Sequence, residues 1–324
     1  MTIPMNPLVI VHSRAFSHQK IAKDIRHVVG GMVLGYNDEL DVYGTPVIYV
    51  GTIDHIDLAM ASRFLLTASK RIIYGVAEGE PILTPETRRI LENSYVIVPS
   101  QHVKELIETV NIHVDEIIPH AVNIPRPDPY LTVDLRLKYE TDTGKQKIAL
   151  WIGANQRRKG PDIVLKIANQ LDDVGIVMIT GDGEIPLPKE PPTNLLIRKE
   201  VFKIDNISNH YAAADFLIVT SRAEGFGLPP LEMLSLGKPV ILPDLDVFRE
   251  IAMTPLTTLY ETTFCYSELY KNYMWMKYCE PDTESLINAI KEYKPPNTLD
   301  KYVAMTDVKL HYGLENYKKF EEFL

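Results

Sequence analysis

The segment with the most chemical content is SRAEGFGLPPLEML, residues 221–234. It follows an apolar run and precedes a helix-forming stretch, so it is expected to be a loop that opens a helix. Gly225 and Gly227 let the backbone of such a loop approach a ligand. Pro229 and Pro230 suit a first helical turn, where a missing N–H costs nothing. The helix N-terminus then offers N–H groups and a positive dipole end, which favour a phosphate.

Two carboxylates lie in the same segment. Glu224 falls in the loop and Glu232 is expected in the first helical turn. Both would repel a phosphate, so we interpret them as acceptors of hydrogen bonds from ligand hydroxyls. A ligand that brings both hydroxyls and phosphates into one pocket fits the description of a nucleotide sugar. The alternative is that Glu232 only complements the helix dipole and that the glycines only form a tight turn.

A basic triplet forms a second candidate binding element, in WIGANQRRKG, residues 151–160. A strand is expected to end at Gly153, and Arg157, Arg158 and Lys159 then precede a helix. Guanidinium and ammonium groups at the carboxyl end of a strand can clamp a diphosphate. Taken alone, the triplet is equally consistent with solvated surface charges. A second phosphate-competent loop in the same part of the chain favours the binding interpretation.

These candidates are set in a regular alternation of strands and helices. In the first part, strands are expected over 9–11, 47–50, 71–75, 95–98 and 116–118, and helices over 18–29, 56–68, 84–93 and 102–110. In the second part, strands are expected over 148–153, 174–181, 195–199, 215–221 and 238–244, and helices over 160–171, 207–214, 229–237, 283–293 and 308–324. Such alternation predicts βαβ units and parallel sheets buried on both faces.

The alternation stops over residues 124–146, which are rich in proline and charge and are expected to be a linker or an irregular crossing. The predicted organisation is an N-terminal, acceptor-side domain (1–127), a linker (128–146) and a nucleotide-sugar-binding domain (147–300). A C-terminal helix (301–324) would follow, for which packing back on the N-terminal domain is one arrangement. Two such domains place a cleft at the carboxyl ends of their sheets.

The composition excludes several classes of protein. The net charge of −9 disfavours binding to nucleic acid or anionic lipid. No apolar run reaches the length of a membrane span, so at most peripheral membrane contact is expected. The N-terminal residues do not resemble a signal peptide. Cys265 and Cys279 are too few for a disulfide framework, which favours a cytoplasmic protein.

The stretch HYAAADFLIVTSRAEGFGLPPLEMLSLGKPVI, residues 210–241, resembles the signature region of the retaining GT-B glycosyltransferases of family four, the glycosyl transferases group 1. The segment 151–160 and the Gly-Asp-Gly turn at 181–183 match the family as well. The resemblance is specific over residues 148–250, fainter over 94–123 and weak before that.

The resemblance implies an α/β GT-B fold of two Rossmann-like domains with an interdomain cleft, and a nucleoside-diphosphate sugar as donor. Glu224 would contact the donor sugar near its reacting face, Glu232 would hold the ribose hydroxyls, and Lys159 would neutralise the diphosphate. The backbone amides of Phe226, Gly227 and Leu228 would face the sugar and the phosphates. No metal and no further cofactor are expected.

The chain departs from the family at Ala154, because the family usually has an arginine directly after the glycine that matches Gly153. Either Arg157 or Arg158 takes over that arginine's task, or Lys159 and the backbone alone hold the diphosphate.

The N-terminal candidates are an acid or a histidine at a strand end. Asp54 and His55 follow one strand and Glu78 follows another, and an acid there could accept the acceptor's proton. The alternative for each is a helix N-cap or a loop charge. His12 and His120 are expected to be structural.

The leading hypothesis is a retaining glycosyltransferase with a carbohydrate, lipid-linked or protein acceptor. The alternatives are a GT-B epimerase or phosphorylase, and a catalytically decayed nucleotide-sugar-binding module. The absence of GxGxxG after the first strand disfavours a dehydrogenase, and the absence of HExxH and CxxC disfavours zinc chemistry. Asp244 and Asp246 mimic a metal-binding DxD motif, but are interpreted as a solvated turn.

Overall fold

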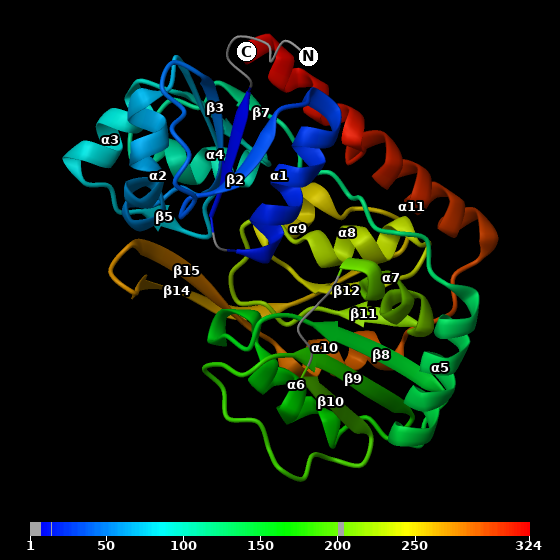
Figure 1. The fold of residues 1–324 in the computed structure, drawn as a ribbon. Coiled ribbons are helices and arrows are strands. Elements are labelled where there is room, and N and C mark those ends of the chain that lie inside the picture. The colour runs from blue at the N-terminus through cyan, green and yellow to red at the C-terminus, as the bar shows by residue number, and fades with distance from the viewer. Residues whose placement is uncertain (1–7, 14, 200–203) are drawn as a thin grey trace. The chain divides into compact units, whose positions relative to one another are not determined.

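The computed structural model describes residues 8–13, 15–199 and 204–324, and the chain divides into two compact units (Figure 1). The first unit comprises Met1–Ala121, Ser267–Met276 and His311–Leu324, and the second comprises Val122–Tyr266 and Lys277–Leu310. Residues 1–7, where no signal peptide is expected, lie outside the described residues.

The first unit is built on a parallel sheet with the strand order β2-β1-β3-β4-β6-β7. Its strands are β1 (Val9–His12), β2 (Met32–Gly35), β3 (Pro46–Thr52), β4 (Lys70–Val76), β6 (Tyr95–Val98) and β7 (Glu116–Ile117). Val9 on β1 lies opposite Met32 on one side and Val47 on the other. The apolar β-branched residues predicted as strands are buried in this sheet, as expected for strands covered on both faces.

The helices of this unit are α1 (Phe16–Val29), α2 (His55–Thr67), α3 (Pro85–Glu92) and α4 (Gln101–Glu108). Three begin at a side-chain cap. Asp54 caps α2, Thr84 caps α3, and Ser100 caps α4, each accepting hydrogen bonds from backbone amides of the first turn. The four helices predicted from periodicity are therefore confirmed.

The second unit is built on a parallel sheet with the order β10-β9-β8-β11-β12-β13. Its strands are β8 (Lys147–Ile152), β9 (Val174–Thr180), β10 (Leu195–Lys199), β11 (Phe216–Ile218), β12 (Val240–Pro243) and β13 (Thr257–Tyr260). This is the order of a doubly wound Rossmann sheet, and it reverses between β8 and β11. The described helices that follow its strands are α6 (Pro161–Ala168), α7 (Ile204–Ala213), α8 (Leu228–Ser235), α9 (Asp246–Ile251) and α10 (Thr283–Lys291).

The expected linker at 128–146 is wrong in its secondary structure, because Pro129–Thr143 form helix α5 of the second unit. Asp128 caps the helix by accepting from the amides of Tyr130 and Leu131. Pro129 stands in the first turn, and Gly144 ends the helix in the left-handed conformation. These end signals were present in the sequence, but the neighbouring prolines and the weak amphipathic pattern concealed them.

The helix predicted over 308–324 is also wrong as one element. Helix α11 (Thr298–His311) ends first, and a 3-10 segment, η2 (Leu314–Phe323), follows Gly313. Residues 311–324 belong to the first unit, where the rings of Tyr317 and Phe320 pack against Tyr74. Residues 301–310 belong to the second unit.

A β-hairpin that the sequence did not indicate is formed by β14 (Thr262–Tyr270) and β15 (Met274–Pro281). Lys271 and Asn272 have φ of 45° and 63°, and the amide of Tyr273 donates to the carbonyl oxygen of Tyr270. Two successive residues with positive φ are typical of the turn that matches hairpin twist. In the first unit, Met274 and Trp275 of β15 pair with β5 (Glu80–Pro81).

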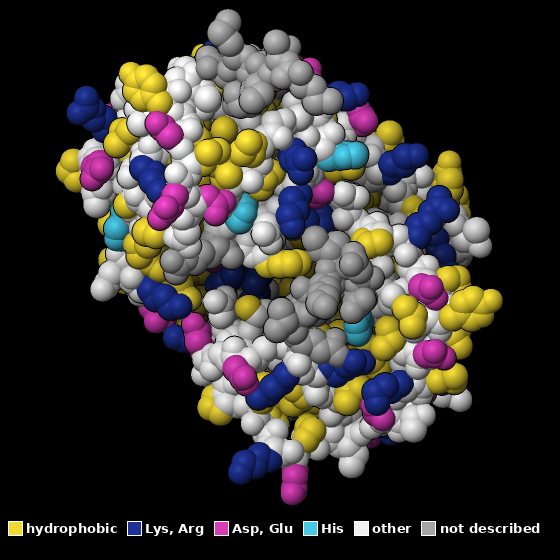
Figure 2. All heavy atoms as spheres, viewed as in Figure 1, with side chains coloured by type: hydrophobic (Ala, Val, Ile, Leu, Met, Phe, Trp, Pro, Cys, Tyr) yellow, Lys and Arg dark blue, Asp and Glu magenta, His cyan; other side chains and the backbone are white. Residues whose placement is uncertain are grey.

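The only two cysteines of the chain, Cys265 and Cys279, join the hairpin strands by a disulfide, so the cysteines do not support the expected cytoplasmic location. The helices of the described residues include none that is both long enough and apolar enough to cross a membrane. On the face shown in Figure 2, basic and acidic side chains are interspersed.

A buried polar cluster lies at the start of α1 in the first unit. Ser13 Oγ is 2.6 Å from His18 Nδ1, and Lys20 donates to Asp24 at 3.0 Å. Tyr74 Oη lies 2.7 Å from Nδ1 of the buried His120. Burial, and next the neighbouring His12, lower the pKa of His18 to about 4. Burial, with the charges of His18 and Lys20, lowers the pKa of His120 well below its ordinary value.

These histidines should make stability depend on pH. Because the pKa of His18 is lower in the folded chain, its stabilising effect is complete above pH 6.5 and is lost as the pH falls toward 4. The loss should reach up to about 3 kcal/mol in the free energy of unfolding. His18→Gln should flatten this part of the pH profile in urea unfolding, whereas His113→Gln, at an exposed site, should follow the wild type. A His18→Gln profile as steep as that of the wild type would contradict the assignment.

Candidate active site

The candidate site lies where the strand order of the second sheet reverses. β8 and β11 are neighbours there, with Ala149 opposite Phe216. Residues 153–160 follow β8, and residues 219–227 follow β11 and lead into α8. Because parallel strands end at the same edge of a sheet, both predicted binding segments lie at one edge. The crevice at such a reversal is where open α/β sheets bind ligands.

Lys159 and Glu224 meet at this edge. Lys159 Nζ donates to Glu224 Oε2 at 2.5 Å, and Ser221 Oγ donates to the same oxygen at 3.3 Å. The side chains of Lys159 and Glu224 are 19% and 9% exposed. Burial alone would raise the pKa of Glu224, but the charges of Lys159 and Arg158 and the hydrogen bonds from Lys159 and Ser221 lower it below its ordinary value. Glu224 is therefore a carboxylate at neutral pH and acts only as an acceptor.

Thr220 holds the two loops together. Its Oγ1 lies within hydrogen-bond distance of the carbonyl oxygens of Lys159, at 3.0 Å, and Gly160, at 2.8 Å, and it accepts from Trp151 Nε1 at 2.8 Å. Gly160 has a φ of +70°, and a Cβ there would lie 2.0 Å from the carbonyl oxygen of Thr220. Only glycine allows this approach, which brings the basic triplet onto the end of β11.

Arg222 is a neighbour of the candidate site that the sequence analysis did not identify. It donates to both oxygens of Asp162, at 2.9 and 2.7 Å, and to Glu280 Oε2 at 2.7 Å. Arg222 Nη1 also donates to the carbonyl oxygen of Arg157. The backbone amide of Arg222 donates to the carbonyl oxygen of Arg158. Its carboxylate partners are 60 and 58 residues away in sequence, so no local signal could have revealed this role.

Glu232 lies one turn further into α8 than predicted, because the helix begins at Leu228 and has no acidic residue in its first turn. Its Oε2 accepts a hydrogen bond from the buried Tyr211 at 2.9 Å. Pro229 lies in the first turn as predicted, after Gly227, which adopts a φ of +92°. A Cβ on Gly227 would lie 2.7 Å from the ring of Phe248, so the backbone needs glycine here.

The Gly-Asp-Gly turn at 181–183 packs against the turn after β8. A Cβ on Gly183 would lie 2.0 Å from the carbonyl oxygen of Asn155. The buried Asn155 side chain also donates to the carbonyl oxygen of Ile185 at 2.9 Å and accepts from its amide at 3.1 Å. Asn155, which the sequence analysis did not single out, therefore holds these two loops in register.

The two arginines of the triplet differ in their surroundings. Arg157 reaches Tyr266 of β14, donating from Nη2 to Tyr266 Oη at 2.7 Å. Arg158 lies close enough to Glu224 for its charge to lower that carboxyl's pKa. Gly153 and Ala154 precede the triplet in the turn that follows β8, and the Ala154 side chain is exposed. The donor-binding role of these residues stays a prediction.

In the first unit, Asp54 is buried and is the N-cap of α2, where Oδ1 accepts from the amides of Ile56 and Asp57 at 2.8 and 2.9 Å. Burial, with the nearby charge of Asp57, raises its pKa to about 6 although these hydrogen bonds oppose the shift. His55 Nδ1 lies 3.1 Å from the carbonyl oxygen of Ile82, and Glu78 is half-buried in the bend after β4. A catalytic role of these residues stays a prediction.

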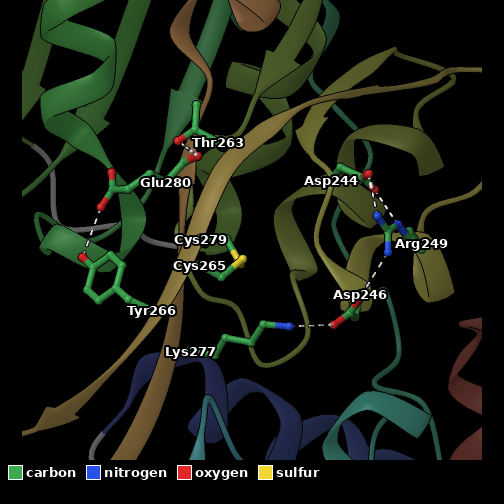
Figure 3. The surroundings of a disulfide bond; sticks show 9 residues. All are labelled: Asp244, Asp246, Arg249, Thr263, Cys265, Tyr266, Lys277, Cys279 and Glu280. Atoms are coloured by element: carbon green, nitrogen blue, oxygen red, sulfur yellow. Dashed lines mark hydrogen bonds and ion pairs between the residues drawn. A yellow bond between two sulfur atoms is a disulfide. The ribbon is translucent and has the colours of Figure 1, made fainter.

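Asp244 and Asp246 face a cation of the chain itself (Figure 3). Arg249 donates to both oxygens of Asp244, at 2.5 and 2.6 Å, and to Asp246 at 3.2 Å. Lys277 lies 3.6 Å from the other oxygen of Asp246. The pair is therefore charge-compensated rather than a simple solvated turn, and Asp246 begins helix α9.

Comparisons with known proteins find a family match over part of the chain. The model of the family described as glycosyl transferases group 1 matches residues 137–254. The chain is 26% identical over 193 residues to uncharacterized glycosyltransferase 335 of Sulfolobus islandicus rod-shaped virus 1, covering 55% of this chain and 57% of the relative. It is 28% identical over 176 residues to D-inositol 3-phosphate glycosyltransferase of Mycolicibacterium smegmatis, covering 51% and 39%. The chain thus matches about half of the length of these relatives.

Solved structures show the fold over nearly the whole chain. Sucrose-phosphate synthase from Thermosynechococcus elongatus superposes with a TM-score of 0.70 at 13% identity, over 98% of both chains. HepE of Anabaena, solved with UDP-glucose, superposes with a TM-score of 0.69 at 14% identity, over 98% of this chain and 99% of its own. Residues 137–254 therefore match the glycosyl transferases group 1 family, and the chain has the GT-B fold of two Rossmann-like units.

Proposed function

We propose that the chain is a retaining, metal-independent glycosyltransferase that transfers a sugar from a nucleoside-diphosphate sugar to a carbohydrate, lipid-linked or protein acceptor. The observation that carries the proposal is the contact of Lys159 with Glu224 where the order of the second sheet reverses. A cation, an ionised carboxylate and the start of α8 converge there. That combination suits a ligand with both phosphates and hydroxyls. The solved complex of HepE with UDP-glucose supports this choice of donor class.

Each charged group has a separate task in this proposal. Lys159 neutralises the diphosphate as it leaves an oxocarbenium-like anomeric carbon, with Arg158 adding positive charge beside it. Glu224 accepts hydrogen bonds from hydroxyls of the donor sugar, and Glu232 accepts them from the ribose. The amides at Phe226, Gly227 and Leu228 face the sugar and the phosphates. Stabilising the charge that develops on the leaving group would be the main catalytic contribution.

A screen of donors tests the proposal most broadly. In a thermal-shift screen, one class among UDP-, GDP- and ADP-sugars should raise the melting temperature of the chain. The chain should then hydrolyse the same donor or transfer its sugar. Donor binding without turnover would indicate a nucleotide-sugar-binding module. A changed sugar on an intact nucleotide would indicate an epimerase, and attack by inorganic phosphate would indicate a phosphorylase.

Lys159→Ala should reduce transfer more than Arg157→Ala or Arg158→Ala. Its ammonium is the group that contacts Glu224 at the proposed reacting face, so its loss should raise the barrier by about 2–4 kcal/mol. The readout is turnover at saturating donor. Lys138→Ala, on the exposed side of α5, is the matched control and should keep wild-type turnover. Unchanged turnover of Lys159→Ala would refute its role.

Glu224→Gln should reduce turnover more than nucleotide affinity, and Glu232→Ala should do the opposite. The sugar changes its charge during the reaction, whereas the ribose is bound equally in the ground and transition states. Calorimetry with the nucleoside diphosphate and turnover measurements on both variants separate the two roles. An affinity loss confined to Glu224→Gln would reverse the assignment.

Transfer should continue after exhaustive treatment with EDTA, because in this proposal the chain's own cations neutralise the diphosphate. Asp244→Asn should also retain activity, since the Asp244 carboxylate is already paired with Arg249. Activity that the chelator abolishes and magnesium or manganese restores would contradict the metal-independent mechanism.

A further inference from the structure

The base of the β14–β15 hairpin lies against the basic triplet within the second unit. The disulfide between Cys265 and Cys279 joins the two strands there (Figure 3). The residue after the first cysteine and the residue before the second are tyrosines, Tyr266 and Tyr278, whose rings stack with centroids 5.6 Å apart. The disulfide therefore fixes the strands directly beside this aromatic pair.

Arg157 is directed toward the aromatic pair. Its guanidinium carbon is 5.9 Å from the ring centroid of Tyr266 and 5.6 Å from that of Tyr278. Its Nη2 also donates to Tyr266 Oη at 2.7 Å. A guanidinium held by both a ring face and a hydroxyl is fixed in direction as well as in position.

Glu280 closes the contact into a ring of interactions. Tyr266 Oη, which accepts from Arg157, donates to Glu280 Oε1 at 3.1 Å, and Glu280 Oε2 accepts from Arg222 Nε at 2.7 Å. Arg222 Nη1 in turn donates to the carbonyl oxygen of Arg157 at 2.8 Å. The amide of Cys279 donates to the carbonyl oxygen of Arg222 at 2.8 Å. Side chain and backbone of Arg157 are thus both tied to the hairpin.

We propose that Arg157 is a positioning residue and that the hairpin base orients the turn carrying Arg158 and Lys159. This inference rests on the proposed function. Arg157 binds Tyr266 rather than the donor, so Arg158 supplies the guanidinium charge that the family places at the position of Ala154. The backbone of Arg158 is held by the same network, because its carbonyl oxygen accepts a hydrogen bond from the amide of Arg222 at 2.7 Å.

The disulfide makes the position of the turn that carries Arg158 and Lys159 depend on whether Cys265 and Cys279 are oxidised or reduced. A dithiol such as dithiothreitol would reduce it, so that the S–S bond breaks, each sulfur gains a proton and the dithiol becomes a cyclic disulfide. The strands then lose the covalent tie beside Tyr266 and Tyr278. Reduction should therefore weaken the same property that loss of the Tyr266 hydroxyl weakens.

The test compares the affinities for UDP and UMP by calorimetry. If the donor screen selects another base, it compares GDP with GMP or ADP with AMP. Tyr266→Phe removes the hydroxyl between Arg157 and Glu280 but keeps the ring. It should weaken diphosphate binding about three- to tenfold while monophosphate binding stays within about twofold. Glu280→Gln and reduction of the wild type should act in the same direction. Tyr302→Phe, on an exposed tyrosine of α11, should change neither affinity.

Two results would overturn the inference while leaving the proposed function intact. One is unchanged diphosphate affinity in Tyr266→Phe and in the reduced wild type. The other is an equal loss of monophosphate and diphosphate affinity, which would indicate general loosening of the unit. A wild-type chain that binds none of the nucleotides would overturn the proposed function itself and this inference with it.

Discussion

The contact between Lys159 and Glu224 is the interaction on which the rest of the candidate site depends. The two residues are 65 positions apart, and they meet because β8 and β11 are neighbours whose carboxyl ends share one sheet edge. Gly160 and Thr220 bring the two loops into backbone contact beneath this ion pair. Arg222 then ties the basic turn to Asp162 and Glu280. The sheet thus sets the approximate position, and these polar contacts fix the directions of the side chains.

The burial of Glu224 explains why the site holds so many cations. A buried carboxylate without a partner costs several kcal/mol, so it either takes up a proton or finds positive charge. Here Lys159 and Arg158 supply that charge and keep Glu224 ionised. In the proposed function the same cations would also contact a diphosphate, while the carboxylate would favour hydroxyl donors beside it. One charge arrangement would therefore suit both halves of the nucleotide sugar that we propose as donor.

Much of the fold could be predicted because local signals agree with the tertiary structure. Short β-branched runs such as Tyr95–Val98 became buried parallel strands. Gly227 precedes α8 at a position that needs glycine, and Pro229 lies in the first turn of α8, which accepts proline. Helix α5 was missed although Asp128 and Gly144 mark its ends, because its exposed apolar residues blur the helical pattern.

The hairpin and the role of Arg222 were missed for a different reason. β14 alternates weakly and is largely exposed, and its pairing with β15 depends on a turn of Lys271 and Asn272, which is not a typical hairpin signal. The partners of Arg222 lie far away in sequence, and only the folded sheet brings them together. Residue types thus indicated the side chains that are capable of chemistry, but not the side chains that position them.

The central claim is that the donor binds at the carboxyl edge of the second sheet. Hydrogen–deuterium exchange of the full chain, with and without the nucleotide sugar selected by the screen, tests it most directly. The account predicts slower exchange of backbone amides in residues 153–160 and 221–232 when the donor is bound. Protection confined to residues 8–121, with these two segments unchanged, would contradict it.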